Sequence, residues 1–464
     1  MNMQRWLKYQ WPFWTSGFLI GLAEILYYIK NKTFITFTTS MAQMSAVAEK
    51  KLLKTSIFEK VFVPDINWVL IGVIIGASLV ALMEKEFRFW VKYNVKALVL
   101  SFVGAFIFSF GTRIGGGCTT HHLLGGIASM NISSWVVAII MQISSFLGLF
   151  IYIKLGLGNY FKPQETKWYA RQEYTLGLID TSKIDEKDED FYIKIIKLLL
   201  YLFTILFFVI IILSGIFDNL PHSLSNIGIF NVIFLLMVGT IAGVGIAKTG
   251  FGNVCGILTP NIHLIFQDGP KKEISKRINY LTRVMFMGMF PFISIMISVI
   301  MLNIAILIGW IVYKIPLPAS SEAQDFLSYG HFLGGFLMGM GSIFMLGCEI
   351  RNYARLGMGY LTAFAAIPGF ILGYLPYVIF KKPIDDWAFS HHLLTITSLP
   401  QIAHNFLGQI LISISYLLFL VGLLFIFIIV SKKSIGLYFY DICTEPIEKI
   451  FLKNILRGKI NVYK

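Results

Sequence analysis

Long apolar runs separated by shorter polar stretches dominate the chain and predict membrane-spanning helices. A helix needs about 20 predominantly apolar residues to cross the hydrocarbon core of a bilayer. Runs that meet or approach this length begin near Trp11, Trp68, Val95, Ser133, Ile193, Gly228, Leu281, Gly330, Gly359 and Phe406. The pattern therefore predicts an all-α polytopic membrane protein with about ten spans.

Two segments between these runs, residues 119–130 and 252–266, are too short and too polar to span a bilayer. Such segments are tolerated at membrane depth only where they are buried in protein or line a polar path. We expect them to form re-entrant short helices. Their N-termini would then direct unpaired N–H groups and positive dipole ends toward a central anion.

One polar insertion, residues 161–190, interrupts the apolar pattern and predicts a linker between two membrane halves. The basic tail alternates apolar and charged residues, which favours an amphipathic helix on the inner leaflet. We expect a first membrane half at 1–158, a cytoplasmic linker at 159–192, a connecting span at 193–227, a second membrane half at 228–382, a final loop and span at 383–431, and a basic cytoplasmic tail at 432–464.

Composition and charge agree with this interpretation. Hydrophobic residues make up 56% of the 464 residues and charged residues only 14%, with a formal net charge of +14. Lys and Arg concentrate in cytoplasmic loops and near anionic headgroups, so the positive charge does not require nucleic acid as a partner. Loop charge predicts cytoplasmic N- and C-termini in the inner (plasma) membrane. The exception is the lysine-rich stretch 50–60, which this orientation places outside.

An internal repeat links the two halves. "GAFIFSFGTRIGGGC" ends at Cys118 and "GGFLMGMGSIFMLGC" ends at Cys348, and glycines precede each cysteine by 14, 7 and 1 positions. Glycines seven residues apart lie on one helix face and allow close helix contact. Because the two spans run in opposite directions in the expected orientation, they predict two inverted repeats, with a substrate site near the midplane.

The chain has four cysteines, with no CxxC pair and no zinc-ligand spacing, so we expect no disulfide framework, metal or cofactor. A buried cysteine is ordinarily a small apolar residue. The repeated Gly-Cys motif instead favours Cys118 and Cys348 as path-lining thiols, and Cys255 in "GFGNVCGIL" follows a looser version of it. A thiol is a weak, polarisable donor.

Other polar residues near these cysteines have two interpretations each. Arg113 and Arg351 either draw an anion toward the cysteines or extend to lipid phosphate. His121 either donates a hydrogen bond to the anion or is structural. Gly117, Gly347 and Thr119 complete the candidate set, because the glycines bring the backbone close to a small ligand. Glu24, inside the first span, indicates either proton coupling or burial with a polar partner.

"GTRIGGGCTTHHLLGGIASM" and "LGCEIRNYARLGMGYLTA" resemble the signatures of the YeeE/YedE family of membrane proteins, which includes bacterial thiosulfate transporters. The resemblance implies an hourglass-shaped pair of inverted halves that imports a small sulfur oxyanion. It also implies that Cys118, Cys348 and Cys255 recognise the anion through S–H contacts. The chain departs from the family in having Thr36 to Thr39 where a further cysteine could lie, and in its paired histidines.

The leading hypothesis is therefore a transporter, not an enzyme, that carries thiosulfate or a related small sulfur anion across the lipid bilayer. Alternatives remain open. The substrate could be selenium or another sulfur species. The thiols could also pass a persulfide between them, or the protein could deliver sulfur to a cytosolic sulfurtransferase-like partner.

Overall fold

The computed structural model describes residues 13–84, 87, 94–160, 191–249, 289–315 and 326–435. Within these ranges the secondary structure is helical, apart from isolated β-bridges between Asn131 and Ser398 and between Ser328 and His392. The helices are α2 (Phe13–Asn31), α3 (Thr38–Leu52), α4 (Trp68–Glu84), α5 (Val95–Ile114), α6 (Ile132–Lys154), α8 (Phe191–Phe217), α9 (Leu224–Ile227), α10 (Ile229–Thr249), α15 (Met289–Ile311), α16 (Tyr329–Phe344), α17 (Glu349–Gly357), α18 (Leu361–Ile379), α19 (Lys381–Phe389) and α20 (Phe406–Ile435).

Eight helical segments in the described ranges are long and apolar enough to cross a membrane, and α4 is apolar but shorter. These segments confirm an all-α polytopic membrane protein. Several expectations fall outside the described residues and stay predictions. They concern Cys255 with the segment 252–266, the linker at 161–190 and the tail beyond residue 435.

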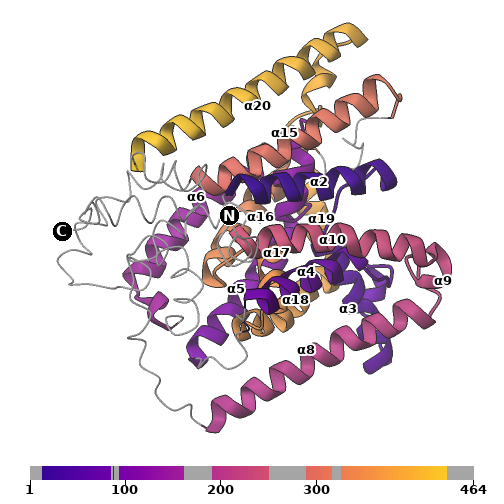
Figure 1. Ribbon diagram of the computed structural model, residues 1–464, viewed down its shortest axis with the longest axis vertical. Coiled ribbons are helices and arrows are strands. Elements are labelled where there is room, and N and C mark those ends of the chain that lie inside the picture. Colours follow the sequence, from indigo (N-terminus) through magenta and orange to yellow (C-terminus); the bar gives the residue numbers. More distant parts are fainter. Residues whose placement is uncertain are drawn as a thin grey trace.

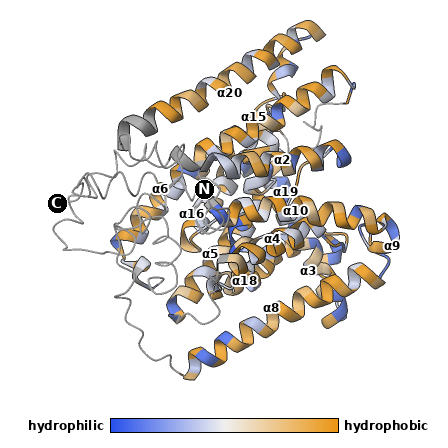
Figure 2. Ribbon diagram, in the orientation of Figure 1, coloured by the Kyte–Doolittle hydropathy of each residue, from blue (hydrophilic) through white to orange (hydrophobic). Residues whose placement is uncertain are grey.

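The helices differ in how much protein surrounds them. Within their most apolar windows, 67% of α18 but only 17% of α8 and of α20 is buried. α8 and α20 lie at opposite sides of the bundle (Figure 1), and apolar residues cover them along most of their length (Figure 2). Because nothing else covers those apolar faces within the described residues, α8 and α20 are suited to face lipid.

The predicted glycine face forms the contact between α5 and α16. A side chain at Gly104 would place its Cβ 2.7 Å from the carbonyl oxygen of Gly341, and one at Gly341 would lie 2.6 Å from that of Gly104. Further along, a Cβ at Gly334 would lie 2.7 Å from the carbonyl oxygen of Gly111. The two helices therefore run in opposite directions with their backbones in contact, which only small residues permit.

The remaining helices pack in reciprocal pairs between the two halves of the chain. α5 packs on α18, and its counterpart α16 packs on α6. In the same way, α4 packs on α10, and its counterpart α15 packs on α2. Small residues lie in these contacts too. The Ser298 hydroxyl donates to the Gly17 carbonyl over 2.7 Å, and Ser144 donates to the Gly335 carbonyl over 3.4 Å. The two predicted membrane halves are thus interleaved and do not form separate bodies.

Two short buried helices follow the glycine-rich spans. One occupies residues 119–128 and includes a π-helical turn at His121–Gly126, and the other is α17. Side chains from neighbouring helices satisfy their terminal carbonyls: Asn303 donates to Ala128 over 2.6 Å, and Ser78 donates to Gly357 over 2.8 Å. Buried backbone groups need such partners where water is excluded.

We expect Gly104→Ala to reduce the free energy of unfolding by about 1–3 kcal/mol, the usual cost of overpacking a close contact. The added methyl group would overlap the backbone of α16 at Gly341 and Met345. Thermal unfolding in detergent measures the effect. Gly422→Ala on α20 is the matched control, because a Cβ there meets nothing within 4 Å. Equal losses in both variants would contradict the proposed role of this contact.

Candidate functional site

Cys118 lies at the end of the glycine loop that follows α5. Gly116 adopts a left-handed backbone with a φ of 75°, which turns the chain sharply before the cysteine. The thiol is buried, and its Sγ lies 2.9 Å from the Thr120 hydroxyl. The Cys118 carbonyl accepts from the amide of His122 over 2.9 Å, so the cysteine begins the short helix at 119–128.

Cys348 occupies the same place after α16. Leu346, two residues before it, is left-handed with a φ of 54°, at the position that Gly116 holds in the first half. Cys348 is the N-cap of α17, and its carbonyl accepts from the amide of Asn352 over 3.1 Å. Neither cysteine is in a disulfide within the described residues, and both thiols are buried at the start of a short buried helix.

The glycine directly before each cysteine makes room for the side chain that lies three residues after that cysteine. A Cβ at Gly117 would lie 2.8 Å from Cγ of His121, and a Cβ at Gly347 would lie 2.8 Å from Cδ of Arg351. His121 and Arg351 thus fold back over equivalent glycines. Any larger residue in place of either glycine would displace these side chains.

The second histidine of the pair has a structural position. His122 is buried and lies 3.0 Å from the Ser134 hydroxyl through Nδ1 and 2.9 Å from the Gly115 carbonyl through Nε2. These contacts hold the glycine loop against the start of α6. Thr119, beside it, is also buried, whereas His121 is partly exposed.

The arginines after Cys348 do not extend to lipid headgroups. Arg351 and Arg355 are 1% and 0% exposed. Arg355 donates to the Met345 carbonyl over 3.1 Å and to the Thr362 hydroxyl over 2.6 Å, so it ties the Cys348 loop to α18. Burial of both side chains excludes the lipid-phosphate interpretation for Arg351.

Arg113, on the last turn of α5, is partly buried and lies over aromatic rings. Its guanidinium carbon is 5.6 Å from the ring centroid of Phe62 and 5.7 Å from that of Tyr374. Its nitrogens point to the Thr39 hydroxyl at 3.4 and 3.5 Å, long for hydrogen bonds. A cation held by ring faces and long contacts keeps much of its positive field available to an anion.

A buried carboxyl group, Glu349, connects the two halves of the chain next to the Cys348 loop. It is the first residue of α17 and only 1% exposed. It accepts from the Thr38 hydroxyl, at the start of α3, and from the Tyr353 hydroxyl over 2.7 Å. The N-termini of α3 and α17 therefore meet at one carboxyl group.

Cys118 belongs to the same cluster. Its thiol lies within electrostatic range of Tyr353 and Tyr374, and Arg113 lies within range of Glu349. Tyr353 stacks at a tilt against Phe37, with 6.1 Å between ring centroids. The structure thus brings the first cysteine loop, the start of α3 and the start of α17 to one buried polar region. We call these residues the central cluster: Thr38, Arg113, Cys118, Cys348, Glu349, Tyr353 and Tyr374.

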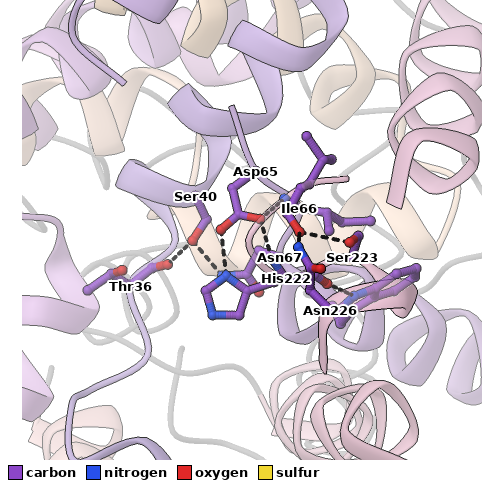
Figure 3. A network of polar contacts seen from close by, with 10 residues as sticks. Thr36, Ser40, Asp65, Ile66, Asn67, His222, Ser223 and Asn226 are labelled. Atoms are coloured by element: carbon purple, nitrogen blue, oxygen red, sulfur yellow. Dashed lines mark hydrogen bonds and ion pairs between the residues drawn. The ribbon is translucent and has the colours of Figure 1, made fainter. Parts of the chain in front are cut away.

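A polar network outside the central cluster fixes the start of α3 (Figure 3). Ser40 donates to the Thr36 carbonyl, and Asn67, before α4, donates to Ser40. Next to Asn67, the Asp65 carboxylate accepts from the backbone amide of His222 over 2.9 Å and contacts the His222 ring. The connector after α8 is therefore fastened to the segment that presents Thr38.

A family model described as sulphur transport matches residues 2–147 and 276–461, which is more than half of the chain. The chain belongs to the sulphur-transport (YeeE/YedE) family. No curated protein matches the sequence. The two matched segments of this sulphur-transport protein contain Cys118 and Cys348, whereas Cys255 lies between them.

The cysteines, glycines and arginines proposed from the sequence as site residues of the sulphur-transport protein stay predictions. Sequence analysis did not single out Glu349 and Thr38, which lie in the central cluster. A carboxylate directly after Gly-Cys, in a segment expected at membrane depth, was the available signal for Glu349. Thr38 gave no signal beyond its place in a threonine run. No group of three or more His, Cys, Asp or Glu side chains in the described part of the chain could hold a metal ion.

We expect the His222–Asp65 pair to stabilise the sulphur-transport protein, and this stabilisation to be lost as pH rises. The hydrogen bond that the His222 ring donates to the Asp65 carboxylate raises the pKa of His222 above its ordinary value of 6.5. A raised folded-state pKa contributes stability that is full below 6.5 and is lost as pH rises through the folded value. The difference in Tm between wild type and His222→Gln should therefore be larger at pH 6 than at pH 9.

Exposed His391 provides the control for this measurement. His391→Gln should give the same Tm as wild type at both values of pH. A His222→Gln effect that does not change between pH 6 and pH 9 would contradict a protonated pair.

Proposed function

We propose that this sulphur-transport protein imports thiosulfate, or a closely related small sulfur anion, along a path lined by Cys118, Cys255 and Cys348. Family membership supports the coarser activity, transport of a sulfur species across a membrane. One observation carries the finer proposal. Two buried thiols each precede the first turn of a short buried helix, at equivalent places in the two halves.

This arrangement suits a small sulfur anion. The first turn of a helix presents unpaired N–H groups and a positive dipole end, which stabilise negative charge. A neutral thiol adds a soft, polarisable contact for a terminal sulfur. Because a thiol is uncharged and a weak donor, it does not hold a dianion too tightly for release.

We place the two cysteine loops in inverted repeats around an hourglass-shaped path. Three features support this: α5 and α16 cross in opposite directions, the helices pair reciprocally, and Gly116 and Leu346 share the left-handed turn. Transporters of this type bind substrate near the midplane between the repeats. Loop charges favour the plasma membrane with cytoplasmic termini.

The flanking residues then have supporting roles. Gly117 and Gly347 let His121 and Arg351 lie against the loop backbone beside the two cysteines. Thr119 would add a hydroxyl donor at the start of its helix. Arg113 would attract the anion by charge, since its guanidinium is not neutralised by an ion pair within the described residues.

We expect Cys118→Ser, Cys255→Ser and Cys348→Ser each to lower uptake of sulfur-labelled thiosulfate by at least about tenfold, which corresponds to about 1.4 kcal/mol. Serine keeps the size and a donor but removes the soft sulfur contact. Uptake is measured in cells without their own thiosulfate importers, and immunoblotting of membranes shows that each variant is present.

Cys443→Ser is the matched control, because Cys443 lies in the basic tail, far along the chain from the three motifs. It should take up thiosulfate as wild type does. If wild-type cells take up no thiosulfate, thiosulfate is not the substrate, and selenium or other sulfur species become the leading candidates. Normal uptake in the serine variants would leave a transporter whose cysteines only pack.

We also expect Arg113→Gln to raise the half-saturation constant for thiosulfate about tenfold, because it removes a positive charge that acts on a dianion through protein. Arg113→Lys, which keeps the charge, should recover most of the affinity. Initial uptake rates over a range of thiosulfate concentrations give the constant. Equal constants for wild type and Arg113→Gln would show that Arg113 serves packing alone.

A further inference from the structure

Glu349 places a carboxyl group where the proposed anion would bind. It directly follows Cys348 and begins α17, so it competes with the anion for the positive end of that helix. Transport by thiols gives this carboxyl no role. A buried acid at such a place is costly to keep and calls for an explanation.

The contacts of Glu349 do not neutralise an ionised carboxylate. Both oxygens accept hydrogen bonds from uncharged hydroxyls, those of Thr38 and Tyr353. Arg113 acts on it electrostatically, but within the described residues the hydrogen bonds of Arg113 go to Thr39 and Thr112. Burying a carboxylate without a close ion pair is unfavourable, so a second negative charge placed beside the ionised form adds to a cost that is already present.

Several elements bring charged or titratable side chains toward Glu349. α3 brings Thr38, α5 brings Arg113, and α18 brings Tyr374. The α4 helix has no titratable side chain before Glu84 at its end, and α10 has Lys248 alone. The cysteine loops add the thiols of Cys118 and Cys348. Arg113 acts on the carboxyl by its charge, and the buried Arg351 and Arg355 lie on α17 itself.

A bound dianion would change the protonation of Glu349. Thiosulfate keeps both negative charges over the physiological pH range, and an adjacent carboxylate would repel it. Two like charges in a buried site cannot both stay ionised at low cost, so one of them takes up a proton. Thiosulfate is the much weaker base, and the proton therefore goes to a carboxyl oxygen of Glu349.

We propose that Glu349 binds a proton when the anion binds, so that the protein carries the proton and the sulfur anion inward together. This proposal rests on the proposed function. The proton enters from the external solution, adds to a Glu349 carboxyl oxygen and leaves on the cytoplasmic side after the anion. One proton per dianion halves the charge moved inward.

The neighbouring hydroxyls suit both states of the carboxyl. A hydroxyl both donates and accepts, so Thr38 and Tyr353 donate to the carboxylate and can accept from the protonated acid after rotation of the O–H bond. No side chain needs to move for the proton to bind. The exchange of proton and anion at the start of α17 then needs only local rearrangement.

Isothermal titration calorimetry of the purified full chain with thiosulfate tests the proposal. Titrations in buffers of different ionisation enthalpy give the number of protons taken up on binding. We expect close to one proton at alkaline pH for wild type, and an affinity that falls about tenfold per pH unit there, as linkage requires for one bound proton. Glu349→Gln should bind with no proton uptake and with an affinity independent of pH.

Glu24→Gln is the matched control. Glu24, on α2, is also a buried carboxyl, but it accepts from the Ile35 amide and not from the hydroxyls that contact Glu349. It should keep the proton uptake and pH dependence of wild type. Proton uptake that persists in Glu349→Gln, or that disappears in Glu24→Gln, would overturn the assignment. Binding by wild type without any proton uptake would overturn it too, whether or not the variants fold.

Transport into proteoliposomes containing a trapped pH indicator separates this proposal from the proposed function. Inward thiosulfate flux with internal acidification supports both. Thiosulfate flux without any pH change would overturn proton coupling and leave the sulfur-anion transporter intact. No flux of thiosulfate in wild type would overturn the proposed function, and the coupling proposal with it.

Discussion

Backbone contact between α5 and α16 is the constraint on which the centre of the protein depends. Glycines at the crossing let the two chains touch at Gly104 and Gly341 and again at Gly111 and Gly334. Because each helix leads directly into a cysteine loop, the crossing sets where both loops lie. Wider spacing of these helices would separate the two short helices and expose their backbone ends in a region without water.

Burial then gives the polar residues near the cysteines their properties. Arg355 stabilises the Cys348 loop by donating to backbone carbonyls, while Arg113 lies against aromatic rings within the central cluster. The two arginines therefore differ in kind. One completes the hydrogen bonds of an irregular segment, and the other contributes charge where water does not screen it.

Hydrophobic patterning and the glycine spacing were enough to predict the long apolar helices, a short helix after Cys118 and the close approach of two spans. They could not identify the partners of α3, since hydropathy along one chain carries no information about which helices pack together. Thr38 and Glu349 are 311 positions apart and meet only through the packing of both halves. Leu346 in a left-handed turn was also unpredictable, because that conformation normally selects glycine.

The contact between Thr38 and Glu349 has a consequence for synthesis. At about 5–20 residues per second, a ribosome needs roughly 15–60 s to make the intervening chain. During that time α3 has no partner from α17, and the Thr38 hydroxyl must be satisfied in another way. The contact between Thr38 and Glu349 can therefore form only after α17 has been made, late in synthesis.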